Sequence, residues 1–124
     1  MQSWGTKSRF RERDTEREPT KSGIVGILCA ALGRKREESL DDFRSVEMGV
    51  RVDREGVVRT EFQTAQNVAR ASGEVSADPQ ISWRQYLADA AFLVALSGQN
   101  RFLHELLTAL RAPRWPLYLG RKSY

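Results

Sequence analysis

Residues 20–33, TKSGIVGILCAALG, carry the pattern that most constrains the fold of this chain. Thr20 or Ser22 can begin a helix, because a hydroxyl there accepts from the free N–H groups of the first turn. Gly33 suits the left-handed residue that ends a helix. One face collects Ile24, Ile27, Leu28, Ala31 and Leu32, and another the small residues Gly23, Gly26 and Ala30. We therefore expect a helix that packs on a core through the first face and lets a neighbouring backbone come close at the second.

A second amphipathic helix is predicted near the C-terminal end, in residues 99–111, QNRFLHELLTALR. Its apolar face consists of Phe102, Leu103, Leu106, Leu107 and Leu110. Pro113 follows and stops the helix, because proline excludes the helical conformation just before it. Between the two helices, residues 36–46 predict a further short helix.

The middle of the chain has the patterning of strands. Val46, Met48, Val50 and Val52 alternate with other residues, and the segment 53–56 has the composition of a turn, so residues 46–62 predict a hairpin. Residues 63–81 have no sustained period and predict a long loop, as do residues 1–19. Residues 83–96 fit a helix and a strand equally well. The order of elements indicates one α+β domain.

The residues suited to catalysis are few. His104 falls off the apolar face of its helix and is expected in solvent, while Cys29 is expected to be a buried and inert thiol. One histidine and one cysteine cannot supply the usual ligands of zinc. Asp41 and Asp42 form the best pair for magnesium, but we expect them to be exposed helix residues. The sequence therefore predicts neither a metal nor a cofactor.

The composition also limits where the protein acts. A single cysteine is typical of a reducing cytoplasm. The chain has no apolar run long enough to cross a bilayer, and its first residues have no apolar middle of a signal peptide. We expect a cytoplasmic protein without a membrane partner.

The positive charge is concentrated near the C-terminal end. The chain has a net charge of +4. Residues 111–124 hold Arg111, Arg114, Arg121 and Lys122 and no acid. A basic segment of this kind can bind phosphate, although a solvated tail explains the charges as well. Trp115 and Tyr118 can stack on bases or pack in a core.

Thr20, Lys21 and Ser22 place hydroxyls and a cation at the start of a predicted helix. Helix N-termini bind anions because their N–H groups lack carbonyl partners. A P-loop is excluded, since it needs glycines before the lysine and residues 16–20 contain none. Simple helix capping remains an equal explanation.

Four segments together resemble the CasD family of type I-E CRISPR Cascade subunits. They are MQSWG (1–5), PTKSGIVGILCAALG (19–33), WRQYLADAAFLVAL (83–96) and PRWPLYLGRKS (113–123). The resemblance implies a single RAMP domain over residues 1–124 with an RRM-like, ferredoxin-like core. It implies that 83–96 is a strand and that 51–82 is a thumb-like extension.

The resemblance also implies a function. Members of the family cap the 5′ handle of the guide RNA and join the backbone subunits to the large subunit, without cleaving RNA. Base stacking is then expected of Trp4, Trp115 and Tyr118, and phosphate binding of Lys21, Arg114, Arg121 and Lys122. Gln2 and Ser3 are expected to read base edges, Thr20 and Ser22 to line the anion seat, and Gly120 to allow close approach. Arg9, Arg11 and Arg13 are weaker candidates.

The chain also departs from the family pattern. The family has a first strand before the segment that matches MQSWG, and it continues beyond GRKS, so we expect an incomplete domain. Gln63 stands where the family often has histidine, which weakens the case for a nuclease. Two alternatives remain: a metal-independent endoribonuclease that processes repeat RNA, and an inactive protein-interaction remnant.

Overall fold

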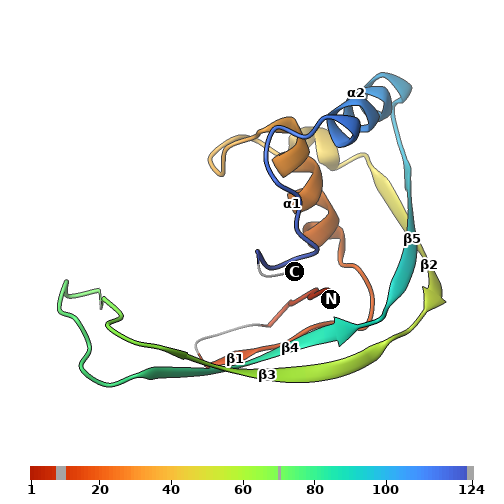
Figure 1. Ribbon diagram of the computed structural model, residues 1–124. Helices are drawn as coiled ribbons and strands as arrows, with labels where there is room; N and C mark the ends of the chain where they lie inside the picture. Colours follow the sequence, from red (N-terminus) through yellow and green to blue (C-terminus); the bar gives the residue numbers. More distant parts are fainter. Residues whose placement is uncertain (8–10, 70, 123–124) are drawn as a thin grey trace.

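The chain folds as a long curved ribbon of strands with two helices at one end (Figure 1). The computed structural model describes residues 1–7, 11–69 and 71–122. Its elements are β1 (Glu12–Arg13), α1 (Lys21–Leu32), the 3₁₀ turn η1 (Asp41–Phe43), β2 (Glu47–Arg54), β3 (Val57–Ala65), β4 (Gln80–Ala88), β5 (Ala91–Ser97) and α2 (Asn100–Arg111). The predicted α+β class is confirmed. Helix α1 lies on the inner side of the curve, and the first residues lie between it and the ribbon.

The predicted hairpin between residues 46 and 62 is wrong. β2 pairs with β5 and β3 pairs with β4, both antiparallel, so β2 and β3 are successive parts of one side of the ribbon. Gly56 has φ +70° and lies against the backbone of Ala88, while Asp89 on the returning side has φ +58°. Two left-handed residues at the same level bend both sides of the ribbon without reversing the chain.

The predicted long loop is shorter than expected. β3 continues to Ala65 and β4 begins at Gln80, so only residues 66–79 connect them, and a bridge between Ala69 and Val75 closes part of that connection. Residues 83–96 are extended, as the resemblance implied, but Asp89 divides them between β4 and β5. β3 and β4 with their connection, residues 57–88, form an arm that extends away from the helices.

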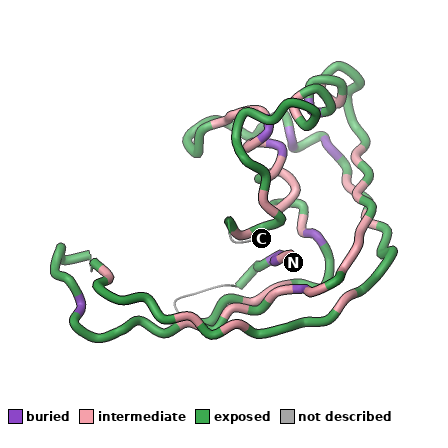
Figure 2. Tube along the Cα trace, in the orientation of Figure 1, coloured by how far each residue is buried: buried purple, intermediate pink, exposed green. Residues whose placement is uncertain are grey.

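The apolar core lies between the helices and the β2–β5 pair. Leu28, Phe43, Val46 and Leu106 are buried together there. Val25 joins the predicted face of α1, and Ile27 is only partly buried. Leu107 and Leu110, which were expected in the core, are 45% and 39% exposed. Figure 2 shows that most of the arm is exposed, whereas buried residues gather near the helices and the first residues.

The second short helix is limited to η1. Ser39 prevents a longer helix because its hydroxyl accepts from the Asp41 N–H at 3.1 Å and donates to the Asp41 carboxylate at 2.8 Å. Such local bonds compete with helical ones. Helix α1, in contrast, forms as predicted: Thr20 Oγ1 accepts from the Gly23 N–H at 3.2 Å, and Gly33 ends it with φ +73°.

Candidate functional site

Three segments that are distant in sequence meet at the start of α1. The Ser3 N–H donates to the Leu119 carbonyl at 2.9 Å, and the Glu16 N–H donates to the Trp4 carbonyl at 2.9 Å. Gly120, with φ +99°, lies directly against the Ser3 carbonyl, in space that a side chain would need. The first residues, the start of α1 and the C-terminal segment therefore form one unit.

This unit borders a solvent-open cavity of about 260 Å³, called here the three-segment cavity. It is lined by Ser3, Trp4, Gly5, Thr20, Ser22, Gly23, Gly120 and Arg121. Six of the predicted site residues, namely Ser3, Trp4, Thr20, Ser22, Gly120 and Arg121, are thus brought together.

The start of α1 gives the cavity a positive end. The N–H groups of Lys21 and Ser22 belong to the first turn, where no helical carbonyl can reach them. The hydroxyls of Thr20 and Ser22 lie 3.3 Å apart beside them. These donors suit an anion such as a phosphate, and Arg121 lines the same cavity.

The side chains of the first segment, however, are occupied inside the protein. Trp4 is 2% exposed, and its ring packs on Gly23, where an added Cβ would lie 2.7 Å from Trp4 Cε3. Ser3 Oγ donates to the Gln85 carbonyl at 3.2 Å. Base stacking by Trp4 and base reading by the Ser3 hydroxyl therefore do not fit this structure.

Gln2 also has a structural role. Its backbone exchanges hydrogen bonds with Leu87 at 3.0 and 2.7 Å. Its amide donates to the Ala90 carbonyl at 2.8 Å and accepts from Trp4 Nε1 at 3.1 Å. Gln2 therefore connects Trp4 to the bend of the ribbon, and its reading of bases stays a prediction.

Two of the predicted phosphate-binding cations donate to backbone carbonyls in this structure. Lys21 Nζ donates to the Val46 carbonyl at 2.5 Å, in the direction of β2. Arg121 donates to the Gln85 carbonyl at 3.1 Å and to the Asp14 carbonyl at 2.9 Å. Arg121 therefore joins the C-terminal segment to β4 and to the first loop while it lines the cavity.

The remaining predicted residues lie along the C-terminal segment outside the cavity. The N–H groups of Arg114 and Trp115 donate to the Ala31 and Ala30 carbonyls, at 3.0 and 3.2 Å, and so cap the end of α1. Trp115 is 44% exposed, which leaves its ring open to a partner. Tyr118 is half-buried and Lys122 is exposed.

A basic groove on the arm was largely missed by sequence reasoning. Three arginines, Arg11, Arg13 and Arg84, and one acid, Glu12, line a cavity of about 750 Å³ beside β1 and β4. β1, within the predicted first loop, pairs in parallel with β4 and sets Arg13 opposite Arg84. Arg84 could have been found only from the pairing, because nothing in the sequence brings residues 11–13 to this strand. Arg9 lies outside the described residues.

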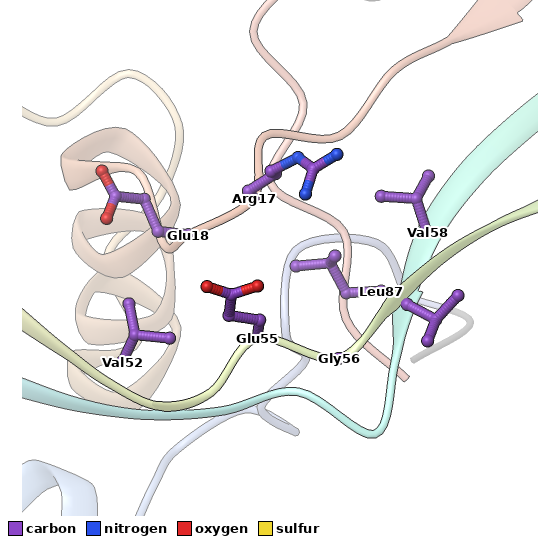
Figure 3. A pocket seen from close by; sticks show the side chains of 8 residues that line it. Arg17, Glu18, Val52, Glu55, Gly56, Val58 and Leu87 are labelled. Carbon is purple, nitrogen blue, oxygen red and sulfur yellow. The ribbon is translucent and has the colours of Figure 1, made fainter.

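A further cavity, of about 430 Å³, opens where the ribbon bends (Figure 3). This bend cavity lies between residues 17–18, just before α1, and the strands around Gly56. It contains none of the individual residues predicted to bind RNA, although its residues 52 and 55–58 lie in the predicted thumb, residues 51–82.

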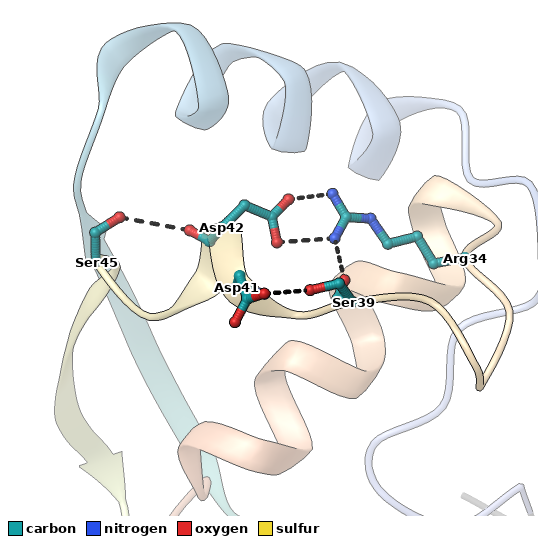
Figure 4. A network of polar contacts seen from close by, with 5 residues as sticks. All are labelled: Arg34, Ser39, Asp41, Asp42 and Ser45. Atoms are coloured by element: carbon teal, nitrogen blue, oxygen red, sulfur yellow. Dashed lines mark hydrogen bonds and ion pairs between the residues drawn. The ribbon is translucent and has the colours of Figure 1, made fainter.

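One ion pair organises the far end of α1. Arg34 binds the Asp42 carboxylate through two nitrogens and also donates to the Ser39 carbonyl at 3.2 Å (Figure 4). This hydrogen bonding lowers the pKa of Asp42 and raises that of Arg34. The guanidinium lies 5.2 Å from the centre of the Phe43 ring. Asp42 is thereby committed to a structural pair, which does not fit the role of magnesium ligand.

Little in the described residues suggests acid–base or metal chemistry. Burial raises the pKa of Cys29, which favours the unreactive thiol. Within residues 1–7, 11–69 and 71–122 no group of three or more His, Cys, Asp or Glu side chains could hold a metal ion. In the same part of the chain no helix is long and apolar enough to cross a membrane.

The family model described as CRISPR-associated protein (Cas_Cas5) matches residues 1–124, and the chain belongs to this family. It is 36% identical to the CRISPR system Cascade subunit CasD of Escherichia coli (strain K12) over 138 aligned residues. That alignment covers 99% of this chain and 62% of the relative, so the chain spans about three-fifths of the relative's length.

Two solved structures resemble the fold. A chain of a structure titled "CRISPR RNA-guided surveillance complex" has a TM-score of 0.92 and 40% identity, over 99% of this chain and 54% of that chain. A "Crystal structure of Cas protein" has a TM-score of 0.75 and 50% identity, over 99% and 53%. The predicted RAMP-type fold is therefore confirmed by its structural relatives.

Proposed function

We propose that this chain binds the 5′ handle of a CRISPR guide RNA as a non-catalytic subunit of a Cascade complex. The observation that carries the proposal is the three-segment cavity, which joins the start of α1, the first residues and the C-terminal segment. Backbone N–H groups and hydroxyls there suit a phosphate at the end of a single strand. The identity to CasD supports the same role.

The roles within this site differ from residue to residue. Ser22, Thr20 and the free N–H groups of α1 receive a phosphate, while Gln2, Trp4 and Arg121 hold the cavity in shape. The exposed ring of Trp115 supplies a stacking surface nearby. Lys122 adds an exposed cation. Binding depends on a preformed cavity more than on flexible cations.

The arm serves assembly in this proposal. We assign the region 51–82 as the thumb that contacts the guide RNA and an adjacent backbone subunit, and the rest of the molecule to the junction with the large subunit. The exposed arm and its basic groove support this assignment. No observation in the described residues favours the endoribonuclease or the inactive remnant.

Binding of matched RNAs tests the proposal. The chain, reconstituted with its Cascade partners, should bind guide RNA with the native handle at least tenfold more tightly than guide RNA with a scrambled handle. Equal affinity for both would exclude the capping role. Replacement of Ser22 by bulky Trp should remove the preference, whereas Ser45→Trp, outside the cavity, should keep it.

A further inference from the structure

The bend cavity combines an apolar floor with a charged rim. Val52 and Val58 of the ribbon and Leu87 of β4 supply the floor. Glu55 extends from the ribbon toward Arg17 and Glu18, which approach from the segment before α1 (Figure 3). Its volume of about 430 Å³ lies in the range of ligand-binding pockets.

The floor favours a flat and largely apolar group. Val52 and Val58 line the cavity and are 44% and 37% exposed. Covering aliphatic surface of this kind stabilises a complex by roughly 25 cal/mol per Å². A ring that lies on these side chains would gain that energy without displacing any part of the described chain.

The charged side chains at the rim of the cavity determine which kind of ring can bind there. Within residues 1–7, 11–69 and 71–122, Arg17, Glu18 and Glu55 take part in no salt bridge. A lysine or arginine side chain would meet the Arg17 guanidinium, and a plain anion would meet the two carboxylates. A neutral ring with N–H donors on one edge satisfies both, because carboxylates accept from amino groups and guanidinium planes stack on bases.

We propose that the bend cavity receives one splayed-out nucleobase that carries an exocyclic amino group, with Glu55 accepting from that group. The inference rests on the proposed function, since the guide RNA must lie nearby. The two cavities are close in the chain: Glu18 is two residues before Thr20, and Leu87 pairs with Gln2. Adenine, cytosine and guanine qualify, and uracil does not.

Amine-deleted handles test this inference. Handle RNAs in which each adenosine, cytidine or guanosine is replaced in turn by purine riboside, zebularine (cytidine without its amino group) or inosine would be titrated against the chain by fluorescence anisotropy. At one position the unmodified chain should lose about tenfold in affinity, the usual effect of one lost base contact. Glu55→Ala should bind the native and amine-deleted RNAs equally, and Glu55→Gln should keep part of the preference because its amide still accepts.

The controls separate the two proposals. Glu37→Ala, an exposed carboxylate outside the cavity, changes the charge equally and should keep the tenfold loss. Val58→Phe should fill the cavity and remove the loss. If the native handle outcompetes a scrambled one while Glu55→Ala responds to every deletion as the unmodified chain does, the inference is wrong and the proposed function stands. If the scrambled handle binds as tightly, both are wrong.

Discussion

At the scale of single residues, Gly120 shows how close packing between the three segments shapes the three-segment cavity. Gly120 has a conformation that other residues rarely adopt, and the Ser3 carbonyl occupies the place of its missing side chain. Gly26, by contrast, lies in the middle of α1 with nothing within 4 Å of an added Cβ. Two glycines of one chain are thus under opposite constraints.

Replacement of each by alanine should give opposite changes in stability. Gly120→Ala should lower the free energy of unfolding by about 1 to 3 kcal/mol or more, because alanine would have to adopt a left-handed backbone and would also clash with the Ser3 carbonyl. Gly26→Ala should raise it by up to about 1 kcal/mol, because alanine favours helix. Urea denaturation measures both. A neutral Gly120→Ala would mean that residues 3 and 120 are not in contact.

Replacement of Trp4 and of Trp115 by alanine should also have different effects on stability and on RNA binding. Trp4→Ala removes a buried ring and should cost about 3 to 5 kcal/mol of stability. Trp115→Ala should change stability by less than about 1 kcal/mol and weaken RNA binding by about 1 to 3 kcal/mol if its exposed ring stacks on a base. Thermal unfolding and RNA titration measure the two effects. A stable Trp4→Ala variant would contradict the assigned burial.

At the scale of elements, one ion pair joins α1, η1 and α2. Arg34 follows α1, binds Asp42 of η1 and lies 5.9 Å from the centre of the Phe102 ring of α2. The Asp42 side chain is 37% exposed, so solvent reduces the energy of the pair.

This pair should make stability depend on acidic pH. Since the folded pKa of Asp42 is lowered, its contribution is present above the unfolded pKa of about 3.9 and is lost as pH falls through the folded value. Asp42→Asn should therefore be less stable than the unmodified chain at pH 7 and approach it in acid. Asp53→Asn, in an exposed pair with Arg51, is the matched control and should change little. A constant difference between pH 7 and pH 2 would contradict the role of Asp42.

At the scale of the whole molecule, a group of arginines lies beside the arm, at a distance from the two helices. The groove formed by Arg11, Arg13 and Arg84 is separated along the ribbon from the helices, and the first residues connect the two regions through Gln2 and Leu87. Arg121 of the three-segment cavity donates to the Gln85 carbonyl, next to Arg84 of the groove, so β4 connects the groove to the site where we propose that RNA binds.

The salt dependence of RNA binding should report the contacts of the arm. Each phosphate contact to a single strand contributes about 0.7 to the slope of log affinity against log salt. Joint replacement of Arg11, Arg13 and Arg84 by alanine should reduce the slope by about two units if all three bind phosphate. Arg36, Arg44 and Arg101, which lie outside the groove, are the matched control. An unchanged slope would remove the groove from the RNA path.

The sequence by itself determined both helices, because their apolar periodicity and the residues Thr20, Gly33 and Pro113 act locally. Through the resemblance to a family it also predicted that residues 1–5, 19–23 and 113–124 contribute to one site, and from the last of these segments Gly120 and Arg121 line the cavity. The strand partners were decided only by the tertiary structure, since the same glycine can reverse a chain or bend it, and Gly56 bends it against Ala88. The roles within the site were decided there as well. Trp4 and Arg121 are residue types that can bind RNA. In the folded chain, however, the Trp4 ring packs on Gly23, and Arg121 donates to two backbone carbonyls.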